Sequence, residues 1–426
     1  MIVAVLVYLC GVCPVSAQEW RVQNSGTSAN LNKICFVDSI HGWAVGENST
    51  IVHTTNGGNL WLRQHATDTI AVYKSIFCVD DSNCVIVGNS NAIVGTTDGG
   101  NTWIKRNIPS TKAQFLNDVY FSNARTGWIV ADGNGVEGSI LKSTDGGGTW
   151  NVVYDSSNGG GFRSVHFIDN KQGWSSGFAG MDLFDPGVVI HTSDGGATWK
   201  FQQIDHRGSL KGVYFISPVL GWAVGGGPWR APANALKTTD GGLSWNYSGP
   251  PIRMNSRDEW FPTVACIDSL VVLLGSQAGC IHRSENGGGV WVVDTVELPN
   301  YIASVFCLDV FHCWACGDSG RIWKYTPSIL SVHEGTSSLP DDPVVSIAVS
   351  QRRHVIDIAY TLNRPISIAT DLYDLLGKKL VSRNLFFQGE GSRTCSFDVH
   401  DYSGGVYYIL STIGSRTYVN SVSLSR

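Results

Sequence analysis

Thr96-Thr97-Asp98-Gly99-Gly100-Asn101-Thr102-Trp103 is the stretch that decides the fold, because the chain repeats its pattern. The other copies end at Trp61, Trp150, Trp199, Trp245 and Trp291, and successive copies lie 42, 47, 49, 46 and 46 residues apart. A period of this length, with room for four short strands, predicts the blades of a β-propeller. Propellers host many unrelated activities, so the repeat indicates architecture and leaves function open.

The acidic residue of each copy is predicted to hold a turn. An Asp carboxylate there can accept hydrogen bonds from backbone N–H groups two or three residues on, and the paired glycines supply positive φ. Two copies carry Asn, whose amide oxygen can accept the same bonds. The predicted turn residues, with no catalytic or metal-binding role, are Asn56, Asp98, Asp145, Asp194, Asp240 and Asn286. The tryptophan that follows is expected to start the next strand and to be buried.

The composition and the first residues predict an exported, strand-rich protein. The chain has 49 glycines and a charged fraction of 15%, which is typical of turns and strands. A net charge of −5 without a Lys/Arg cluster argues against a nucleic-acid partner. Residues 1–17 are apolar and end in Val15-Ser16-Ala17, which predicts a signal peptide. A membrane anchor is the alternative, but about 16 residues is short for one, and no transmembrane segment is expected in the mature chain.

Seven segments with the pattern of a second blade strand predict a closed ring of seven blades. The last repeat ends at Ile322–Thr326 without its eight-residue stretch or its fourth strand, whereas Glu19–Gln23 is similar to the segment that starts at Trp61. We therefore predict a seven-bladed propeller over residues 18–326, whose last blade takes its outer strand from the mature N-terminus. Closure of this kind removes free sheet edges.

The repeat ends before a second predicted domain. Residues 327–344 are rich in Ser, Pro and Asp and predict a linker. Residues 345–426 alternate apolar and polar side chains, which predicts a small immunoglobulin-like β-sandwich. Strands are expected at Val355–Leu362, Ile366–Tyr373, Lys379–Leu385, Cys395–Val399, Val406–Thr412 and Thr417–Leu424. The predicted fold class is therefore all-β throughout.

The repeated stretch resembles the Asp-box, or bacterial neuraminidase repeat. Phe36-Val37-Asp38-Ser39-Ile40-His41-Gly42-Trp43-Ala44-Val45-Gly46 is also similar to the Phe-x-Asp-x-x-x-Gly-Trp-x-Val-Gly repeat of the photosystem II assembly and stability factor family. This resemblance covers roughly residues 19–326. It implies a propeller, but a photosystem role belongs to particular members and is not carried over.

The C-terminal domain resembles the sorting domain of the type IX (Por) secretion system. The matching segments are Leu372–Lys378, Phe397-Asp398 and Gly404–Ile409, which follow the pattern hydrophobic-Tyr-Asp-x-x-Gly-Lys … Gly-x-Tyr. The resemblance implies export across two membranes and the secretion machinery as a partner of this domain. It also implies that the protein is secreted or held at the outer cell surface.

Two cysteine pairs are predicted to form disulfides. Most blades carry Phe in the first strand and Gly six residues later, whereas two blades carry Cys78/Cys84 and Cys307/Cys313. These positions face one another across a hairpin, within disulfide reach, and an exported chain favours oxidation. Cys313 and Cys316 also form a C-x-x-C pattern, but residues three apart in a strand face opposite sides, so no metal site is expected.

Long loops on one propeller face are the expected functional region. The loops between second and third strands at Asp132–Gly138, Gly180–Gly187 and Gly226–Asn234, and the connection Pro250–Pro262, should gather in one sector. Candidate binding residues there are Asp182, Asp185, Trp229, Arg230, Arg257, Asp258, Glu259 and Trp260. Such side chains on loops suit recognition of a protein or glycan. The alternative is neutral loop variation, in which Trp229 and Trp260 only cover blade ends.

A non-enzymatic binding module is the favoured function. A sialidase-type site needs an arginine triad, and the early Arg-Ile-Pro signature of that family is absent. A xyloglucanase-type site needs two facing carboxylates, for which candidates exist only in the long loops. We therefore expect no catalytic residues, metal or cofactor, and a protein or glycan ligand on the long-loop face. An exo-acting glycoside hydrolase is the alternative.

Overall fold

The computed structural model describes residues 19–424 except 67–70, 109–113, 134–136, 157–159, 181–186, 203, 205–207, 227–233, 252–259, 297–299, 310–311, 327–343, 353–354, 363, 375–377, 388, 390, 401, 403–404 and 414–415. Within these residues, every regular element is a β-strand except η1, one turn of 3₁₀-helix at Asp318–Gly320. The predicted all-β class is confirmed. The predicted signal peptide, residues 1–17, lies outside the described residues.

The described propeller strands fall into seven antiparallel groups of four, here called blades one to seven. Blade one is β2(Leu31–Phe36), β3(Gly42–Gly46), β4(Ile51–Thr54) and β5(Leu62–Gln64), and blade two is β6(Tyr73–Cys78), β7(Cys84–Gly88), β8(Ile93–Thr96) and β9(Ile104–Lys105). Blade three is β10(Phe115–Phe121), β11(Gly127–Gly133), β12(Glu137–Ser143) and β13(Asn151–Ser156), and blade four is β14(Phe162–Phe167), β15(Gly173–Phe178), β16(Gly187–Thr192) and β17(Lys200–Gln202). Blade five is β18(Leu210–Phe215), β19(Gly221–Gly225), β20(Asn234–Thr238) and β21(Asn246–Tyr247). Blade six is β22(Thr263–Cys266), β23(Val272–Gly275), β24(Ile281–Ser284) and β25(Val292–Val296), and blade seven is β26(Ile302–Cys307), β27(Cys313–Gly317), β28(Ile322–Thr326) and β1(Glu19–Gln23).

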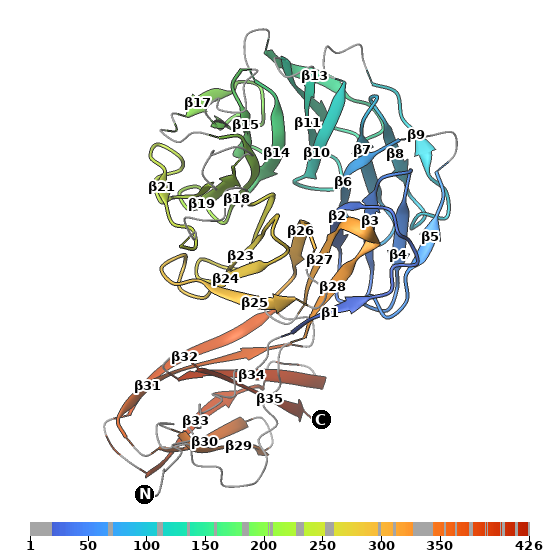
Figure 1. Cartoon of the computed structure of the whole chain (residues 1–426). Coiled ribbons are helices and arrows are strands. Elements are labelled where there is room, and N and C mark those ends of the chain that lie inside the picture. Colours follow the sequence, from blue (N-terminus) through green and yellow to red (C-terminus); the bar gives the residue numbers. More distant parts are fainter. Residues whose placement is uncertain are drawn as a thin grey trace, which may run out of the picture.

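The innermost strand of each blade faces a common axis. Each of these strands contacts the innermost strand of the next blade, and β26 contacts β2 across the point where the chain closes. Figure 1 shows the blades arranged around this axis. The first strands therefore form the wall of a central channel, and their side chains decide what the channel contains.

Closure comes from the N-terminal strand, as predicted. β1 pairs antiparallel with β28, from Glu19 opposite Thr326 to Gln23 opposite Ile322. β1 also pairs in parallel with β25 of blade six, which joins blades six and seven into one eight-stranded sheet. Trp20 is fully buried between these blades. The structure thus confirms the borrowed outer strand and adds a second pairing that the sequence did not indicate.

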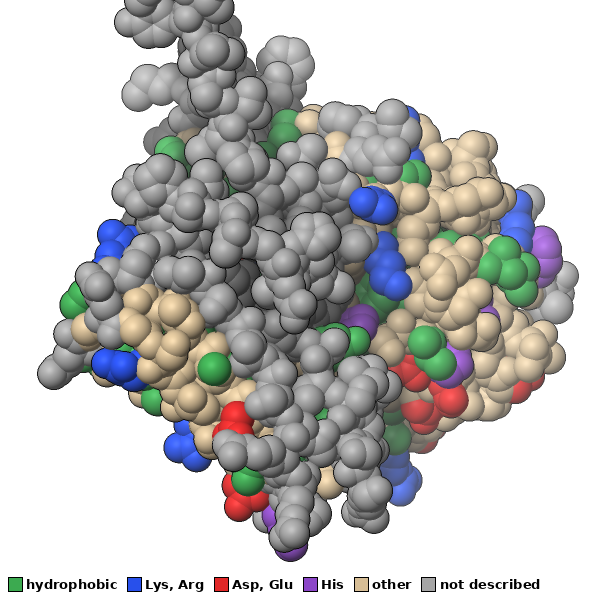
Figure 2. Space-filling view, turned by 90° about the horizontal axis from the view of Figure 1, so that it is seen from below, with side chains coloured by type: hydrophobic (Ala, Val, Ile, Leu, Met, Phe, Trp, Pro, Cys, Tyr) green, Lys and Arg blue, Asp and Glu red, His purple; other side chains and the backbone are tan. Residues whose placement is uncertain are grey.

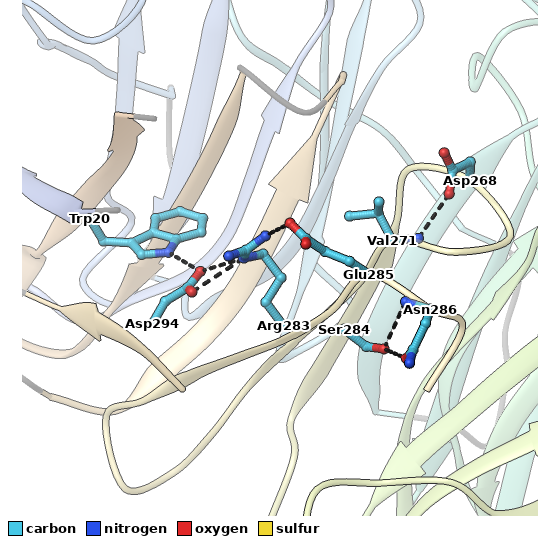
Figure 3. A network of polar contacts seen from close by, with 8 residues as sticks. All are labelled: Trp20, Asp268, Val271, Arg283, Ser284, Glu285, Asn286 and Asp294. Atoms are coloured by element: carbon cyan, nitrogen blue, oxygen red, sulfur yellow. Dashed lines mark hydrogen bonds and ion pairs between the residues drawn. The ribbon is translucent and has the colours of Figure 1, made fainter. Parts of the chain in front are cut away.

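A buried polar contact holds Trp20 in place. Its Nε1 donates to Asp294 Oδ2 at 3.2 Å, and Arg283 Nε donates to both oxygens of Asp294 at 3.2 Å. Arg283 also pairs with Glu285. Figure 3 shows that these side chains point toward one another between the N-terminal strand and blade six. A carboxylate with charge-assisted partners satisfies the only polar atom of an otherwise apolar ring.

The predicted turn residues of the repeated stretch do form hydrogen bonds within their turns, but their partners lie further along the chain than predicted. Asp98 Oδ1 accepts a hydrogen bond from Thr102 N, four residues on, at 2.9 Å, and Oδ2 accepts from the Thr102 hydroxyl at 2.6 Å. The expected reach of two or three residues is wrong, because Gly99 and Gly100 both adopt positive φ and lengthen the turn. The same contact to the residue four on is made by Asn56, Asp145, Asp194, Asp240 and Asn286.

The tryptophans of the repeated stretch lie just before the outer strands, whereas they were predicted to be the first residues of those strands. Trp103 is buried but lies just before β9, which begins at Ile104. Its Nε1 donates to Gln64 Oε1 of the preceding blade at 3.1 Å. The ring therefore packs between neighbouring blades. The outer strand begins only after it and is short.

The two predicted disulfides are present, Cys78–Cys84 and Cys307–Cys313. Both replace a Phe and Gly pair that other blades use at the same hairpin positions. In blade one, a Cβ on Gly42 would lie 2.5 Å from the ring of Phe36, so a large ring here requires glycine opposite. Cystine is the second solution to the same packing position.

The C-terminal domain is a sandwich of two sheets. One sheet has the order β29(Val344–Arg352), β30(Val355–Leu362), β33(Gly391–Asp398), and the other has β32(Lys379–Phe387), β31(Ile366–Tyr373), β34(Gly405–Ile413), β35(Arg416–Leu424). Their facing side chains form one apolar core. Tyr360 crosses it and pairs with Thr370 and Ser411, each at 2.7 Å. Strand β29 was not predicted, and the immunoglobulin-like topology stays a prediction.

Candidate functional site

A pocket of about 390 Å³ lies on the propeller axis, lined by the innermost strands of all seven blades. Six of these strands have an irregular register near their start, where the strand pairing skips one residue: the second residue in five strands, and the third residue in β10, where the shift lies between Leu116 and Asp118. In blades two and five, for example, the shift falls between Tyr73 and Ser75 and between Leu210 and Gly212. A bulge re-aims the side chain of its extra residue. The skipped residue of each bulged strand is therefore placed differently from an ordinary strand residue.

These skipped residues are mostly basic or amide-bearing. They are Asn32, Lys74, Asn117, Arg163 and Lys211, and all five line the pocket, as does Ala303 of blade seven. They lie at the face that carries the loops between second and third strands, since Phe115 pairs with Asp132 and Leu210 with Gly225 at the ends of those strands. We call Lys74, Arg163 and Lys211 the mouth cations.

The mouth cations outnumber the carboxylates that form ion pairs with them. Arg163 Nη2 lies 2.9 Å from Asp132 Oδ2, a carboxylate that is almost fully buried. Lys74 and Lys211 form no ion pair with a described residue. Burial, followed by the nearby charges of Arg163 and Lys74, lowers the pKa of Lys211 to about 8. Burial, followed by Arg163, lowers the pKa of Lys74 as well, although the carboxylates of Glu47 and Asp132 oppose part of this shift. The mouth therefore concentrates positive charge that an anion would stabilise.

Deeper in the pocket, Asp118 joins the strands of several blades. It accepts from Lys33 Nζ at 3.2 Å and Ser75 Oγ at 2.6 Å through Oδ1. Oδ2 accepts from Ser164 Oγ and from Val165 N, both at 3.1 Å. The carboxylate of Asp118 is thus saturated by structural partners and is poorly placed to act as a base.

His166 also faces this region and is neutral at ordinary pH. Burial is the main cause that lowers its pKa to about 4, and Lys33 opposes protonation further. Its Nδ1 accepts a hydrogen bond from Phe215 N at 3.3 Å, which requires an unprotonated nitrogen. In the described part of the chain, no group of three His, Cys, Asp or Glu side chains is arranged to hold a metal ion.

Trp260 is the one predicted binding residue that the structure describes. Its ring is half-buried beside the mouth, and Lys211 Nζ lies 4.7 Å from the ring centroid, within cation–π reach. The other predicted binding residues lie outside the described residues: Asp182, Asp185, Trp229, Arg230, Arg257, Asp258 and Glu259. The predicted long loop Asp132–Gly138 is wrong at both ends. β11 and β12 extend so that Gly133 pairs with Glu137, and Asp132 is a buried strand residue.

The mouth cations were missed by the sequence reasoning, although a signal exists. Each follows the first apolar residue of an innermost strand, as in Tyr73-Lys74, Phe162-Arg163 and Leu210-Lys211. Aligning the repeats at this position reveals a cationic column that the overall charge of −5 hides. On the face seen in Figure 2, the basic and acidic side chains of the described residues form small separate groups. The described residues contain no helix long and apolar enough to cross a membrane.

Comparison with known proteins agrees with the repeat. A family model described as the photosynthesis system II assembly factor YCF48 matches residues 13–108, 63–161 and 110–212. The chain resembles this family of propellers. The photosystem II assembly lipoprotein Ycf48 of Synechococcus sp. (strain CC9902) is 25% identical over 349 residues, which covers 73% of this chain and 89% of that protein. The predicted resemblance to an assembly-factor propeller is confirmed.

Solved structures support the same fold. The structure of YCF48 bound to D1 peptide has a TM-score of 0.57 and 18% identity, and covers 72% of this chain and 96% of that chain. The GH74 xyloglucanase from Xanthomonas campestris has a TM-score of 0.57 and 13% identity, and covers 93% of this chain and 74% of that chain. At these identities the likeness establishes the propeller fold alone, and it includes both a peptide-binding protein and a hydrolase.

Proposed function

We propose that this chain is a non-enzymatic interaction module that binds an acidic segment of a partner protein at the mouth of the axial pocket. The observation that carries the proposal is the mouth itself, where Lys74 and Lys211 lie beside Arg163 and form no ion pair with a described residue. Gathering like charges in a half-buried site is unfavourable unless a ligand compensates. A carboxylate supplies that compensation through charge-assisted hydrogen bonds.

A peptide ligand fits better than a neutral glycan. Asn32 and Asn117 alternate with the cations around the mouth. Their amide nitrogens donate to the carbonyls of Tyr73 and Phe162 in the neighbouring strands, and the Asn32 amide oxygen can accept a hydrogen bond from a peptide N–H group. Trp260 offers an apolar plane at the same place. The relative whose solved structure holds a D1 peptide gives a precedent for peptide binding on this fold.

Selection from a displayed peptide library tests the proposal. The purified protein should enrich peptides rich in Asp and Glu, and the double variant Lys74→Glu/Lys211→Glu should lose them. Lys105→Glu is the matched control, because Lys105 is exposed on β9, far from the axis in its blade. Enrichment of neutral peptides, or the same peptides with the double variant, would contradict the proposal. Binding to neutral glycans alone would favour the glycan ligand instead.

We also propose that residues 1–17 direct export and that the C-terminal domain serves as a type IX-like sorting tail, which makes the secretion machinery its partner. The similar segments Leu372–Lys378 and Gly404–Ile409 support this view. Truncation at about residue 330 should leave the propeller intact and abolish delivery to the exterior or the cell surface. Unchanged delivery would remove the sorting role.

The alternative function is an exo-acting glycoside hydrolase. It is supported by a shared fold with a xyloglucanase, and its candidate acids, Asp182, Asp185, Asp258 and Glu259, lie outside the described residues. Asp118 of the axial pocket and Asp132 beside Arg163 argue against it, because both carboxylates are engaged by cations. Release of sugar from xyloglucan by the wild type, lost on Asp258→Asn, would favour the hydrolase.

A further inference from the structure

A repeated contact seals the blade interfaces of this propeller. In blade three, Trp128 donates from Nε1 to the carbonyl of Gly195 in the turn of blade four at 3.2 Å. Its ring stacks on Phe167 of blade four with centroids 3.5 Å apart. Lys142, which pairs with Trp128 across the strands, places its Nζ 5.4 Å from the centroid of the indole ring. The indole is therefore held by an aromatic face, a carbonyl and a cation.

Blade seven repeats this arrangement against blade one. Trp314 stacks on Phe36 at 3.6 Å and donates to the Gly57 carbonyl at 3.3 Å, and Lys324 lies 5.7 Å from its ring centroid. In blade four Trp174 stacks on Phe215 and donates to the Gly241 carbonyl, with the His191 ring in place of the lysine. The indole position is thus a recurring, well-defined binding position of the fold.

Blade two lacks the tryptophan, but the neighbouring blade three still carries the groups that contact the indole ring at the other interfaces. The strand register puts Val85 at the place of the tryptophan and Gly95 at the place of the lysine. Phe121 of blade three is buried in one core cluster with Val85 and keeps the edge contact with its own Trp150 at 5.8 Å. The Phe77 ring lies 5.9 Å away and is tilted, so no described ring stacks parallel to Phe121. A pocket of about 200 Å³ opens there, between blades two and three.

The polar parts of the receptor also remain. The carbonyl of Gly146, which corresponds to that of Gly195, accepts no hydrogen bond from the described residues. Arg106 takes the place of the missing cation, since its Nε lies 3.3 Å from where a Cβ on Gly95 would be. All of these residues line the pocket, and its rim is formed by the exposed Asn83, Thr97 and Ala124.

We propose that this pocket binds an indole ring, presented by a tryptophan side chain of a partner polypeptide. The ring stacks on Phe121, its N–H donates to the Gly146 carbonyl, and the Arg106 guanidinium lies against the opposite face. The volume suffices for an aromatic ring, because a cavity of about 150 Å³ already takes benzene. The pocket lies among the turns of the repeated stretch, on the face opposite the mouth cations, so it is a second interaction site.

The other blade without the tryptophan does not offer the same receptor. Blade six carries Leu273 at that position, but blade seven has Cys307 where Phe121 lies in blade three. Arg283 is moreover bound to Asp294. The aromatic face and an available cation therefore occur together only at the interface of blades two and three among the described residues.

Ligand-observed NMR on the purified protein tests the proposal, with N-acetyltryptophanamide as the probe. Saturation transfer from wild type should be strong and should fall by at least about tenfold for Val85→Trp, which fills the pocket with the chain's own indole. The Cys313-Trp314 sequence of blade seven shows that a tryptophan follows a disulfide cysteine here without conflict. Val85→Trp should also melt at a higher temperature than wild type, since it completes the contact. Equal transfer from both proteins, or none from wild type, would overturn the proposal.

Further probes and variants keep the test decisive if Val85→Trp fails to fold. Arg106→Gln should weaken binding, and Arg63→Gln, an exposed arginine on β5, should not. N-methylindole lacks the donor and should bind several-fold more weakly than indole; equal binding would contradict the role of the Gly146 carbonyl. A capped Gly-Trp-Gly peptide should bind at least as tightly as free indole. Binding of indole without the peptide would show that the pocket does not receive a partner's side chain.

Discussion

Lys33 Nζ lies 3.2 Å from Asp118 Oδ1, so a side chain of blade one meets a carboxylate of blade three within the axial pocket. Asp118 is almost fully buried, whereas about a third of the Lys33 side chain is exposed. The same carboxylate accepts from Ser75 and Ser164 on blades two and four. The contact therefore ties four innermost strands together at one point.

Removing the cation should destabilise the propeller. Lys33→Met leaves Asp118 buried with neutral donors only, and we expect a loss of about 1–3 kcal/mol in the free energy of unfolding. Urea denaturation measures this loss. The double variant Lys33→Met/Asp118→Asn should recover part of it, because the uncompensated charge is gone. Additive losses in this cycle would show that the two residues do not interact.

The N-terminal strand is expected to matter more than its length suggests. Trp20→Ala removes a fully buried ring and one of the hydrogen bonds to Asp294, at a cost of about 3–5 kcal/mol. Leu62→Ala on the outer strand of blade one is the control, since Leu62 is 61% exposed and should cost little. Thermal unfolding compares the two. A Trp20→Ala protein that melts with the control would mean that β1 does not close the ring.

The turn carboxylates should make stability depend on acid. Hydrogen bonds from Thr198 lower the pKa of Asp194 to about 2, and Ser244 does the same for Asp240. A lowered folded-state pKa gives stability that is present above the ordinary value of about 4 and is lost as pH falls toward 2. Asp194→Asn should therefore differ from wild type at pH 5 and converge with it near pH 2. Urea midpoints at each pH would show this, and a constant difference would contradict it.

Ligand binding at the mouth should weaken at mildly alkaline pH. Burial and the neighbouring cations hold the pKa of Lys211 at about 8, well below an ordinary lysine at about 10.4. Deprotonation removes a positive charge, so affinity for an acidic peptide should fall as pH rises from 7 to 9. Lys211→Arg keeps its charge and should keep its affinity across this range. A wild type without this pH dependence would show that Lys211 does not contact the ligand.

Much of the fold could be predicted because it depends on local sequence patterns that recur in each blade. The period of the repeated stretch predicted the blades. The joint replacement of Phe and Gly by Cys78 and Cys84 predicted a disulfide. These features depend on contacts within one hairpin or turn. The reach of Asp98 to Thr102 was misjudged because two consecutive glycines at positive φ lengthen the turn. The strand β29 was missed because it follows directly on a linker-like segment.

The candidate site was harder to predict, because it is assembled from one residue per blade. Lys74, Arg163 and Lys211 are far apart in the chain, and a bulge rather than strand alternation sets their direction. The long loops of the sequence correctly indicated Trp260, which lies beside the mouth cations. Asp132 was predicted to begin a loop, but it is a buried strand residue. Only the closed ring brings the cations to one mouth.

The most direct test of the account is calorimetric titration of the purified protein with a capped peptide rich in Asp and Glu. Wild type should bind it, with affinity that falls steeply as salt rises, and Lys74→Glu/Lys211→Glu should lose at least about tenfold in affinity. The same-length peptide with Asn and Gln should not bind, and Lys105→Glu should behave as wild type. Equal affinity of wild type and the double variant for the acidic peptide would contradict the claim that the mouth cations form the binding site.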